Sequence, residues 1–167
     1  MKSLAVFVAF ALLCSFVRAQ VTSEDTLRTS INGGASSLQV AANFSVSNQI
    51  SQLNISVTKT ISGNEYTITS EVTSGPMLVL GGSSFILQLD VNLNDSTGQG
   101  LINFSGRQMT ITGGFYSGPS FSSANYLFTM SNTAIIIDSG TFTASKILNM
   151  SSGRLNLTGG LFTGSSQ

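Results

Sequence analysis

The chain has 167 residues, of which 7 are Lys or Arg and 7 are Asp or Glu, so its formal net charge is zero. Charged residues make up only 8% of the chain and no basic patch exists, which argues against a nucleic-acid partner. There is no histidine and one cysteine, Cys14, which excludes zinc sites built from Cys and His and nucleophiles activated by His.

Residues 1–19 have the organisation of a secretory signal peptide. Lys2 supplies the positive start, residues 4–13 form the apolar stretch, and residues 17–19 form a small-residue cleavage pattern before Gln20. The alternative is a membrane anchor, but an apolar stretch of about ten residues is shorter than the roughly twenty that span a bilayer. We therefore expect cleavage after residue 19, secretion, and no membrane span.

Cleavage would change the composition of the protein. Removing 19 of the 167 residues leaves 148, with no cysteine and with five basic against seven acidic residues. A mature chain without thiols forms no disulfides, so its stability must come from apolar packing and backbone hydrogen bonds. Because charges are so sparse, solubility has to come from Ser, Thr, Asn and Gln, or from groups attached to them.

Asn-X-Ser/Thr sequons identify N-linked glycans as the candidate attached groups. None has Pro in the middle, and in a secreted chain such a sequon is an acceptor for glycosylation. The alternative is chance, since a chain rich in Asn, Ser and Thr produces sequons by composition alone. The six candidate sites are Asn43, Asn54, Asn94, Asn103, Asn149 and Asn156.

Residues 20–58 fit the later pattern of the chain poorly. One coil can be drawn through residues 31–34 to Leu38 and Val40, whereas residues 46–58 alternate apolar and polar side chains without a clear register. No helical periodicity stands out. We therefore expect an N-terminal cap or irregular first coils in this stretch, built without a helix.

Residues 59–167 are expected to form stacked coils, because three segments near the end superimpose without a gap. The segments are 102–118, 128–144 and 148–164, and apolar residues recur in them at the same five positions. A period near twenty residues indicates a solenoid, in which each unit buries its apolar row only against its neighbours.

Alternation inside each unit indicates strands. Met109 and Ile111 flank Thr110, a period of two that directs the threonine outward. The glycines at 113–114 and 159–160 supply the permissive backbone of a corner, and the aromatic residue that follows points back inward.

The register continues towards the N-terminus with unequal spacing. A spacing of 24 residues aligns Leu78, Leu80, Phe85 and Leu87 with Ile102, Phe104, Met109 and Ile111. A spacing of 19 residues aligns Ile61, Tyr66 and Ile68 with Leu80, Phe85 and Leu87. Together with the strand alternation, the repeat predicts an all-β fold, a single-stranded parallel β-helix (β-solenoid) of about five to six coils. The unequal spacing favours loops of different length over a strict short repeat. The polar insertion at residues 117–125 is either a recognition loop or slack at a turn.

The repeated pattern is an apolar-x-apolar strand, Thr-Gly-Gly (112–114) or Asp-Ser-Gly (138–140), an aromatic residue, then a small residue. It resembles the right-handed β-helix proteins of the pectin-lyase-like superfamily, and is similar especially to repeat-rich surface proteins typified by the polymorphic outer-membrane adhesins. The resemblance covers about residues 59–164. The resemblance implies a parallel β-helix. For function it offers only an analogy with surface proteins.

Enzymes of that superfamily cleave or modify acidic polysaccharides, using clustered carboxylates with Arg or Lys. The best candidate here is the pair Glu71 and Asp90, which the register places at one position of adjacent coils, about 5 Å apart. Such a pair either binds a cation or is two solvated acids at a corner. No basic residue shares that position, so we expect no catalytic residues, no metal and no cofactor.

The last coil ends at residues 161–164 without a helix or charged segment to cover it. We expect either further coils of a longer chain or end-to-end stacking of copies. The sequence thus predicts a secreted, N-glycosylated protein with a structural or adhesive role and possible contact with carbohydrate. The alternatives are a polysaccharide-modifying, lyase-like enzyme or its inactive relative, and a filament-forming subunit.

Overall fold

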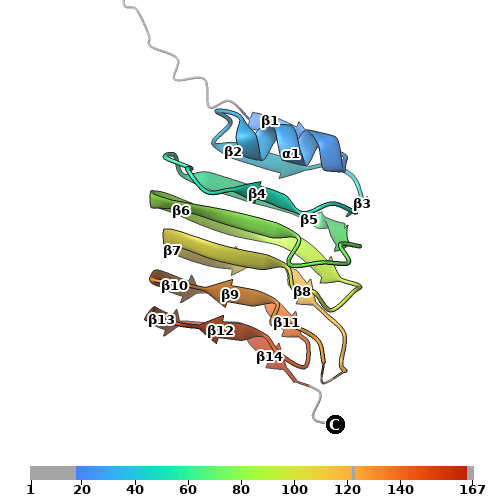
Figure 1. Ribbon diagram of the computed structural model, residues 1–167, viewed down its shortest axis with the longest axis vertical. Coiled ribbons are helices and arrows are strands. Elements are labelled where there is room, and N and C mark those ends of the chain that lie inside the picture. Colours follow the sequence, from blue (N-terminus) through green and yellow to red (C-terminus); the bar gives the residue numbers. More distant parts are fainter. Residues whose placement is uncertain (1–17, 122, 165–167) are drawn as a thin grey trace, which may run out of the picture.

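The computed structural model describes residues 18–121 and 123–164, which form a parallel β-solenoid of about five turns (Figure 1). The fold class expected from the sequence is thereby confirmed. The expected signal peptide, residues 1–19, lies outside the described residues except for its last two. The elements of the described chain are β1 (Arg18–Val21), α1 (Glu24–Asn32), β2 (Ser37–Val40), β3 (Phe44–Val46), β4 (Ile50–Gln52), β5 (Lys59–Ser70), β6 (Leu78–Asp95), β7 (Ile102–Gly113), β8 (Phe115–Ser117), β9 (Phe128–Met130), β10 (Thr133–Ile137), β11 (Thr141–Thr143), β12 (Leu148–Met150), β13 (Gly153–Leu157) and β14 (Leu161–Thr163).

Each coil has three faces, and every strand pairing in the described chain is parallel. The first face contains β1, β2, the start of β5, the middle of β6, the end of β7, β10 and β13. The second contains β3, the ends of β5 and β6, β8, β11 and β14. The third contains β4, the starts of β6 and β7, β9 and β12. The long strands β5, β6 and β7 bend around corners and so belong to two faces.

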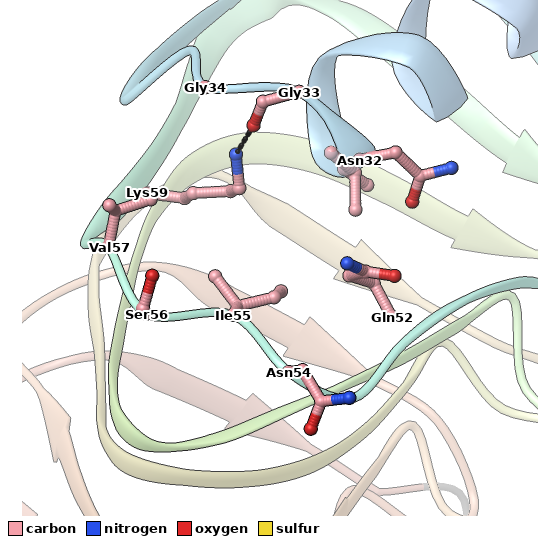
Figure 2. A pocket seen from close by; sticks show the side chains of 10 residues that line it. Asn32, Gly33, Gly34, Gln52, Asn54, Ile55, Ser56, Val57 and Lys59 are labelled. Carbon is pink, nitrogen blue, oxygen red and sulfur yellow. Dashed lines mark hydrogen bonds between the residues drawn. The ribbon is translucent and has the colours of Figure 1, made fainter.

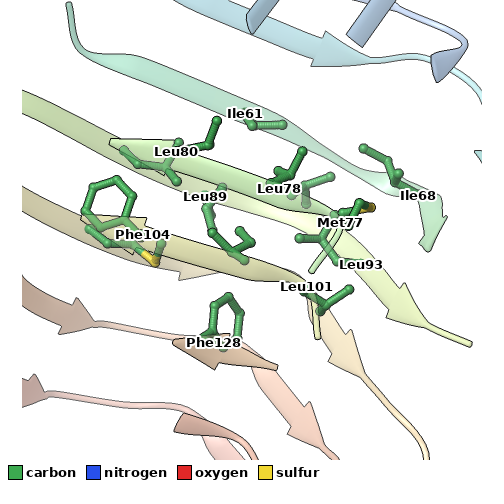
Figure 3. Packing of buried hydrophobic residues seen from close by; sticks show 14 of the residues in the cluster. Ile61, Ile68, Met77, Leu78, Leu80, Leu89, Leu93, Leu101, Phe104 and Phe128 are labelled. Atoms are coloured by element: carbon green, nitrogen blue, oxygen red, sulfur yellow. The ribbon is translucent and has the colours of Figure 1, made fainter. Parts of the chain in front are cut away.

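One continuous apolar core runs along the inside of the three faces (Figure 3). Strand alternation directs every second residue inward, and residues at one position of successive coils stack into columns. On the first face one column reads Leu38, Ile61, Leu89, Ile111, Ile137 and Leu157. Because each inner member of this column packs against the coils above and below it, the core is built by stacking and not by any coil alone.

Aromatic rings stack on the second face, as the repeat predicted. Tyr116 lies 5.0 Å from Phe142 between ring centroids, and Phe142 lies 4.7 Å from Phe162, with nearly parallel planes. The Tyr116 hydroxyl donates to the Gly113 carbonyl at 2.9 Å, and burial raises the pKa of this phenol well above its ordinary value. The stack therefore stabilises the three last coils without a free polar group inside.

Glycine makes the corner before this stack possible. Gly114 has φ +94°, and a Cβ there would lie 2.2 Å from the Val91 carbonyl of the preceding coil. Gly140 and Gly160 at the equivalent corners also have positive φ. The corner therefore requires glycine both for its conformation and for the close approach of neighbouring coils.

The register predicted for the last coils is confirmed. Met109 pairs with Ile135 and Ile135 with Leu155, while Tyr116, Phe142 and Phe162 pair in the same way.

The register predicted for the earlier coils is correct only in part. Leu78 pairs with Ile102 as expected, but the partner of Met109 is Leu87 and not Phe85. The cause is a register shift between Gly82 and Ile86, which adds residues at a corner.

The N-terminal end corrects the expectation that the mature chain lacks a helix. Helix α1 begins after Ser23, whose side chain accepts from the Thr26 N–H while the Thr26 side chain accepts from the Ser23 N–H, a capping box. Leu27 and Ile31 are buried against the first coil. Ile31 thus belongs to the helix and not to a coil, and the first complete coil consists of β2, β3 and β4.

Lys59 joins this helix to the solenoid. Its side chain is 1% exposed and occupies an inward position of β5. Its ammonium donates to the Gly33 carbonyl at 2.9 Å (Figure 2) and to the carbonyls of Ser30 and Ala35 at 3.1 and 2.8 Å. Burial lowers the pKa of the ammonium, while the three carbonyls at the helix C-terminus favour its charged form. All three ammonium donors are used, so this buried charge is satisfied.

We expect Lys59→Met to destabilise the protein by about 1–3 kcal/mol, because it leaves buried carbonyls at the end of α1 without a donor. Chemical denaturation measures the free energy of unfolding. Lys146→Met, at a half-buried position without a carbonyl partner among the described residues, is the matched control and should change it little. Equal stability of the two variants would contradict the capping role of Lys59.

Replacing Ile111 by Asp should disrupt the stack, because Ile111 is buried between Leu89 and Ile137 of the neighbouring coils. We expect a loss of at least about 3 kcal/mol, since the core has no partner for a carboxylate. Thr112→Asp places the same charge on the exposed neighbouring residue and serves as control. Cooperative thermal unfolding of Ile111→Asp at the parental temperature would show the assignment of the core to be wrong.

Candidate functional sites: sequon faces, corner sites and the open coil

The sequons lie on the outside of the solenoid. Their asparagines are exposed at positions 43, 54, 149 and 156 and half-buried at 94 and 103. Asn156 is on the first face and Asn94 on the second, while Asn103 and Asn149 are on the third. Asn43 directly precedes β3, and Asn54 follows β4 at a corner.

The amide nitrogens of these six asparagines make no hydrogen bond within the described chain. Asn43 and Asn94 use only their Oδ1 atoms, which accept from the Thr67 N–H and the Ser117 hydroxyl, both at 2.7 Å. Asn92, which belongs to no sequon, differs: its Nδ2 donates to the Asn64 carbonyl at 2.6 Å. Since a glycan attaches at Nδ2, the sequon side chains can carry one without losing a contact.

The third face brings two sequons into one column. Asn103 pairs with Thr129, which pairs with Asn149, so the two asparagines stand two coils apart as the repeat predicted. Asn156 pairs with Ile136 on the first face instead. The sequons are therefore spread over three faces and do not mark one side of the rod.

The structure does not bring the carboxylates of Glu71 and Asp90 into one column. Asp90 pairs with Ser62 on the first face, whereas Glu71 follows Ser70, which pairs with Asp95 on the second. The predicted pairing fails because the 19-residue offset between these coils is wrong: Ile68 pairs with Leu93 and not with Leu87.

The side chains of Glu71 and Asp90 have separate partners. The Ser45 hydroxyl donates to Glu71 at 2.7 Å, and the Asn64 amide donates to Asp90 at 3.3 Å. Neither carboxylate contacts the other, so the two do not form the candidate cation site.

Asp90 instead lines a polar corner pocket of about 280 Å³. The segment inserted by the register shift in β5 forms its wall and contributes Glu65 and Tyr66 beside Asn64. The repeat pattern does not reveal this site, because an irregular strand brings its residues together. The residues offer carboxylates and amides to a ligand, but no basic group lines the pocket.

The insertion at residues 117–125 leads into the corner between the second and third faces, and two aromatic side chains on it or beside it are exposed. Phe121 is 43% exposed, and Tyr126 is 38% exposed with the Lys146 ammonium 5.7 Å from its ring centroid. The Ser145 hydroxyl donates to the Phe121 carbonyl at 3.1 Å, and the Asn125 N–H donates to the Gly98 carbonyl at 2.7 Å. The aromatics are thus presented from an anchored loop.

Buried Asp95 supports that loop from below. Its carboxylate accepts from the N–H groups of Thr97, Gly98 and Gly100 at 3.2, 2.9 and 2.8 Å. These contacts fix the turn on which Phe121 and Asn125 rest. The position of Asp95 in a strand gave no signal of this role in the sequence.

A second pocket, of about 240 Å³, lies between the end of α1 and the segment after β4 (Figure 2). Asn32, Gln52 and the sequon residue Asn54 line it together with Val57. It contains no carboxylate, and its one charged residue, Lys59, is already engaged by helix carbonyls.

The last coil leaves apolar side chains exposed at the C-terminal end of the described chain. Leu155, Leu157, Leu161 and Phe162 are 45%, 52%, 61% and 41% exposed.

Comparisons with known proteins identify no relative: no family model, no curated protein and no solved structure matches the chain. Among the described residues no helix is long and apolar enough to cross a membrane. The same residues contain no group of three or more acidic side chains placed to hold a metal ion.

Proposed function

We propose that this protein is a secreted, N-glycosylated β-solenoid that serves as a structural or adhesive display module outside the cell. The observation that carries the proposal is the placement of the six sequons: all stand on outward positions with Nδ2 free of partners in the described chain. A cleavable N-terminal segment, as expected for residues 1–19, supports the same compartment.

Glycans on this fold would oppose the lateral association of its sheets. Parallel strands with few charges present broad faces that can associate sideways, and bulky hydrated sugars oppose such contacts. Because sequons occur on all three faces, glycans would cover the rod around its circumference. Glycosylation precedes folding in the secretory pathway, and the outward asparagines allow the coils to close with the sugar attached.

The anchored corner loop supplies the adhesive part of the proposal. Tyr126 and Phe121 are partly exposed aromatic side chains, a type that packs against the apolar faces of sugars, and Lys146 adds a positive charge over the Tyr126 ring. This arrangement supports contact with acidic or neutral carbohydrate. It agrees with the resemblance to pectin-lyase-like and adhesin-type β-helices, which remains a resemblance of sequence pattern.

A polysaccharide-modifying function has less support in the geometry. Its proposed centre, Glu71 with Asp90, is divided between two faces, and Asp90 shares its pocket with Glu65 but with no basic side chain. Turnover of a pectin-type or alginate-type substrate that disappears in Asp90→Ala would favour this alternative over display.

N-glycosylation is tested by mass. We expect the protein secreted from a eukaryotic host to lose several glycan masses when N-glycans are removed enzymatically. Asn94→Gln should remove one of them, while Asn92→Gln, two residues away on the same strand, should remove none. A secreted protein whose mass equals that of the bare mature chain would overturn the proposal.

Carbohydrate contact is tested on an array of acidic and neutral polysaccharides. We expect Phe121→Ser combined with Tyr126→Ser to weaken binding at least about fivefold, because stacking contributes about 1 kcal/mol. Phe115→Ser removes an equally exposed ring from the second face and is the control. Unchanged binding of the double variant would leave the loop without an adhesive role.

A further inference from the structure

The sequon residue Asn54 lies on a rim between two hollows of the surface. One is the pocket of about 240 Å³ beside the end of α1, here called the helix-side pocket. The other has a volume of about 190 Å³ and is bounded by residues 54–56 and 82–84, and it is here called the serine hollow. A sugar attached to Asn54 would therefore begin at the edge of a ready-made depression and not on an open strand face.

The Asn54 amide faces the serine hollow. Figure 2 shows that it points away from Asn32 and the end of α1. On the opposite wall, Ser83 and Ser84 are exposed, and their hydroxyls make no hydrogen bond within the described chain. Both serines belong to the stretch of β6 where the register shifts after Gly82. This irregularity thus supplies two free hydroxyls opposite a free sequon amide.

The floor of the serine hollow is backbone that cannot retreat. The Ile55 N–H donates to the Gly81 carbonyl at 2.9 Å, and a Cβ on Gly82 would lie 2.1 Å from the Ile55 carbonyl oxygen. The two coils are therefore in close contact below the hollow, and its shape is set before any ligand enters.

An apolar side chain stands beside the hollow. Leu53 directly precedes the sequon and is 54% exposed. Its Cδ2 lies 3.6 Å from the place that a Cβ on Gly81 would occupy, so the side chain leans over the next coil at this corner. A group that covered Leu53 would remove apolar surface from water, which is favourable.

We propose that the first sugar of the Asn54 glycan is seated in the serine hollow. Its apolar ring face would cover Leu53, and its hydroxyl and acetamido groups would meet Ser83 and Ser84. The inference rests on the proposed N-glycosylation. Because the sugar is tethered at the rim, the contact is intramolecular, and even a weak interaction is populated. The glycan would then join the first complete coil, which contains Asn54, to the next coil.

The experiment compares thermal unfolding of variants secreted from one eukaryotic host, with sugar occupancy at each sequon measured by mass. We expect Asn54→Gln to unfold about 2–4 °C below the parent protein, since one apolar contact is lost in a chain of this length. Asn156→Gln, at another exposed sequon, is the matched control and should change the temperature little. Enzymatic trimming of all glycans to their first sugar should also change it little.

A second set of variants locates the sugar. The stabilising effect of the Asn54 glycan should disappear in a Leu53→Ser background, as a double-mutant cycle measures. It should persist with Val57→Ser, which alters a 42% exposed side chain of the helix-side pocket. Hydrogen exchange of the amides at residues 82–84 should be slower with the glycan than without it.

The outcomes separate this inference from the proposed function. An occupied Asn54 whose loss changes neither the unfolding temperature nor exchange at residues 82–84 would overturn the seat and leave glycosylation intact. Loss of the effect with Val57→Ser but not with Leu53→Ser would place the sugar in the helix-side pocket and contradict the inference. So would a secreted protein that carries glycans at other sequons and none at Asn54, whereas a protein without any N-glycan would refute the proposed function itself.

Discussion

Everything in this molecule depends on the stacking of neighbouring coils. A coil of about twenty residues cannot bury its own apolar row, so Ile111 is a core residue only because Leu89 and Ile137 cover it from both sides. The same stacking supplies the backbone hydrogen bonds between parallel strands. Stability is therefore a property of interfaces between coils, and the first complete coil, which α1 covers on one side, needs a different solution there.

The N-terminal solution is a helix with a buried cation. Helix α1 covers the first coil, but its C-terminal carbonyls would then face the apolar interior without donors. Lys59 removes that difficulty because it reaches from the second coil to the Ser30 carbonyl in the last turn of the helix and to the Gly33 and Ala35 carbonyls just after it. Burying a charge at an inward position costs free energy. Here the three hydrogen bonds offset that cost, and they also give the carbonyls at the helix end a donor. The cap and the solenoid are consequently one cooperative unit.

The sequence predicts the last three coils well because their spacing changes only in one loop, so Met109, Ile135 and Leu155 align directly. It fails in the earlier coils: Ile61 and Ile68 pair with Leu89 and Leu93 and not with Leu80 and Leu87, and the shift after Gly82 moves the partner of Met109 from Phe85 to Leu87. Helix α1 has only two buried large apolar residues, Leu27 and Ile31, and so gives little periodic signal. The pocket around Asp90 is formed by the residues inserted after Gly63, and the support of the corner loop by Asp95 comes from a turn outside the repeat, so neither follows from the repeated pattern.

The distribution of polar and apolar surface gives the rod a direction. Sequons occupy its sides on all three faces, and hydrated sugars there would oppose lateral association of the strands. Among the described residues, Leu155, Leu157, Leu161 and Phe162 form a group of exposed apolar side chains in the last coil. The opposite end is occupied by α1. Lateral association of the described coils is therefore the contact that sugars would oppose most, because the sides carry all six sequons.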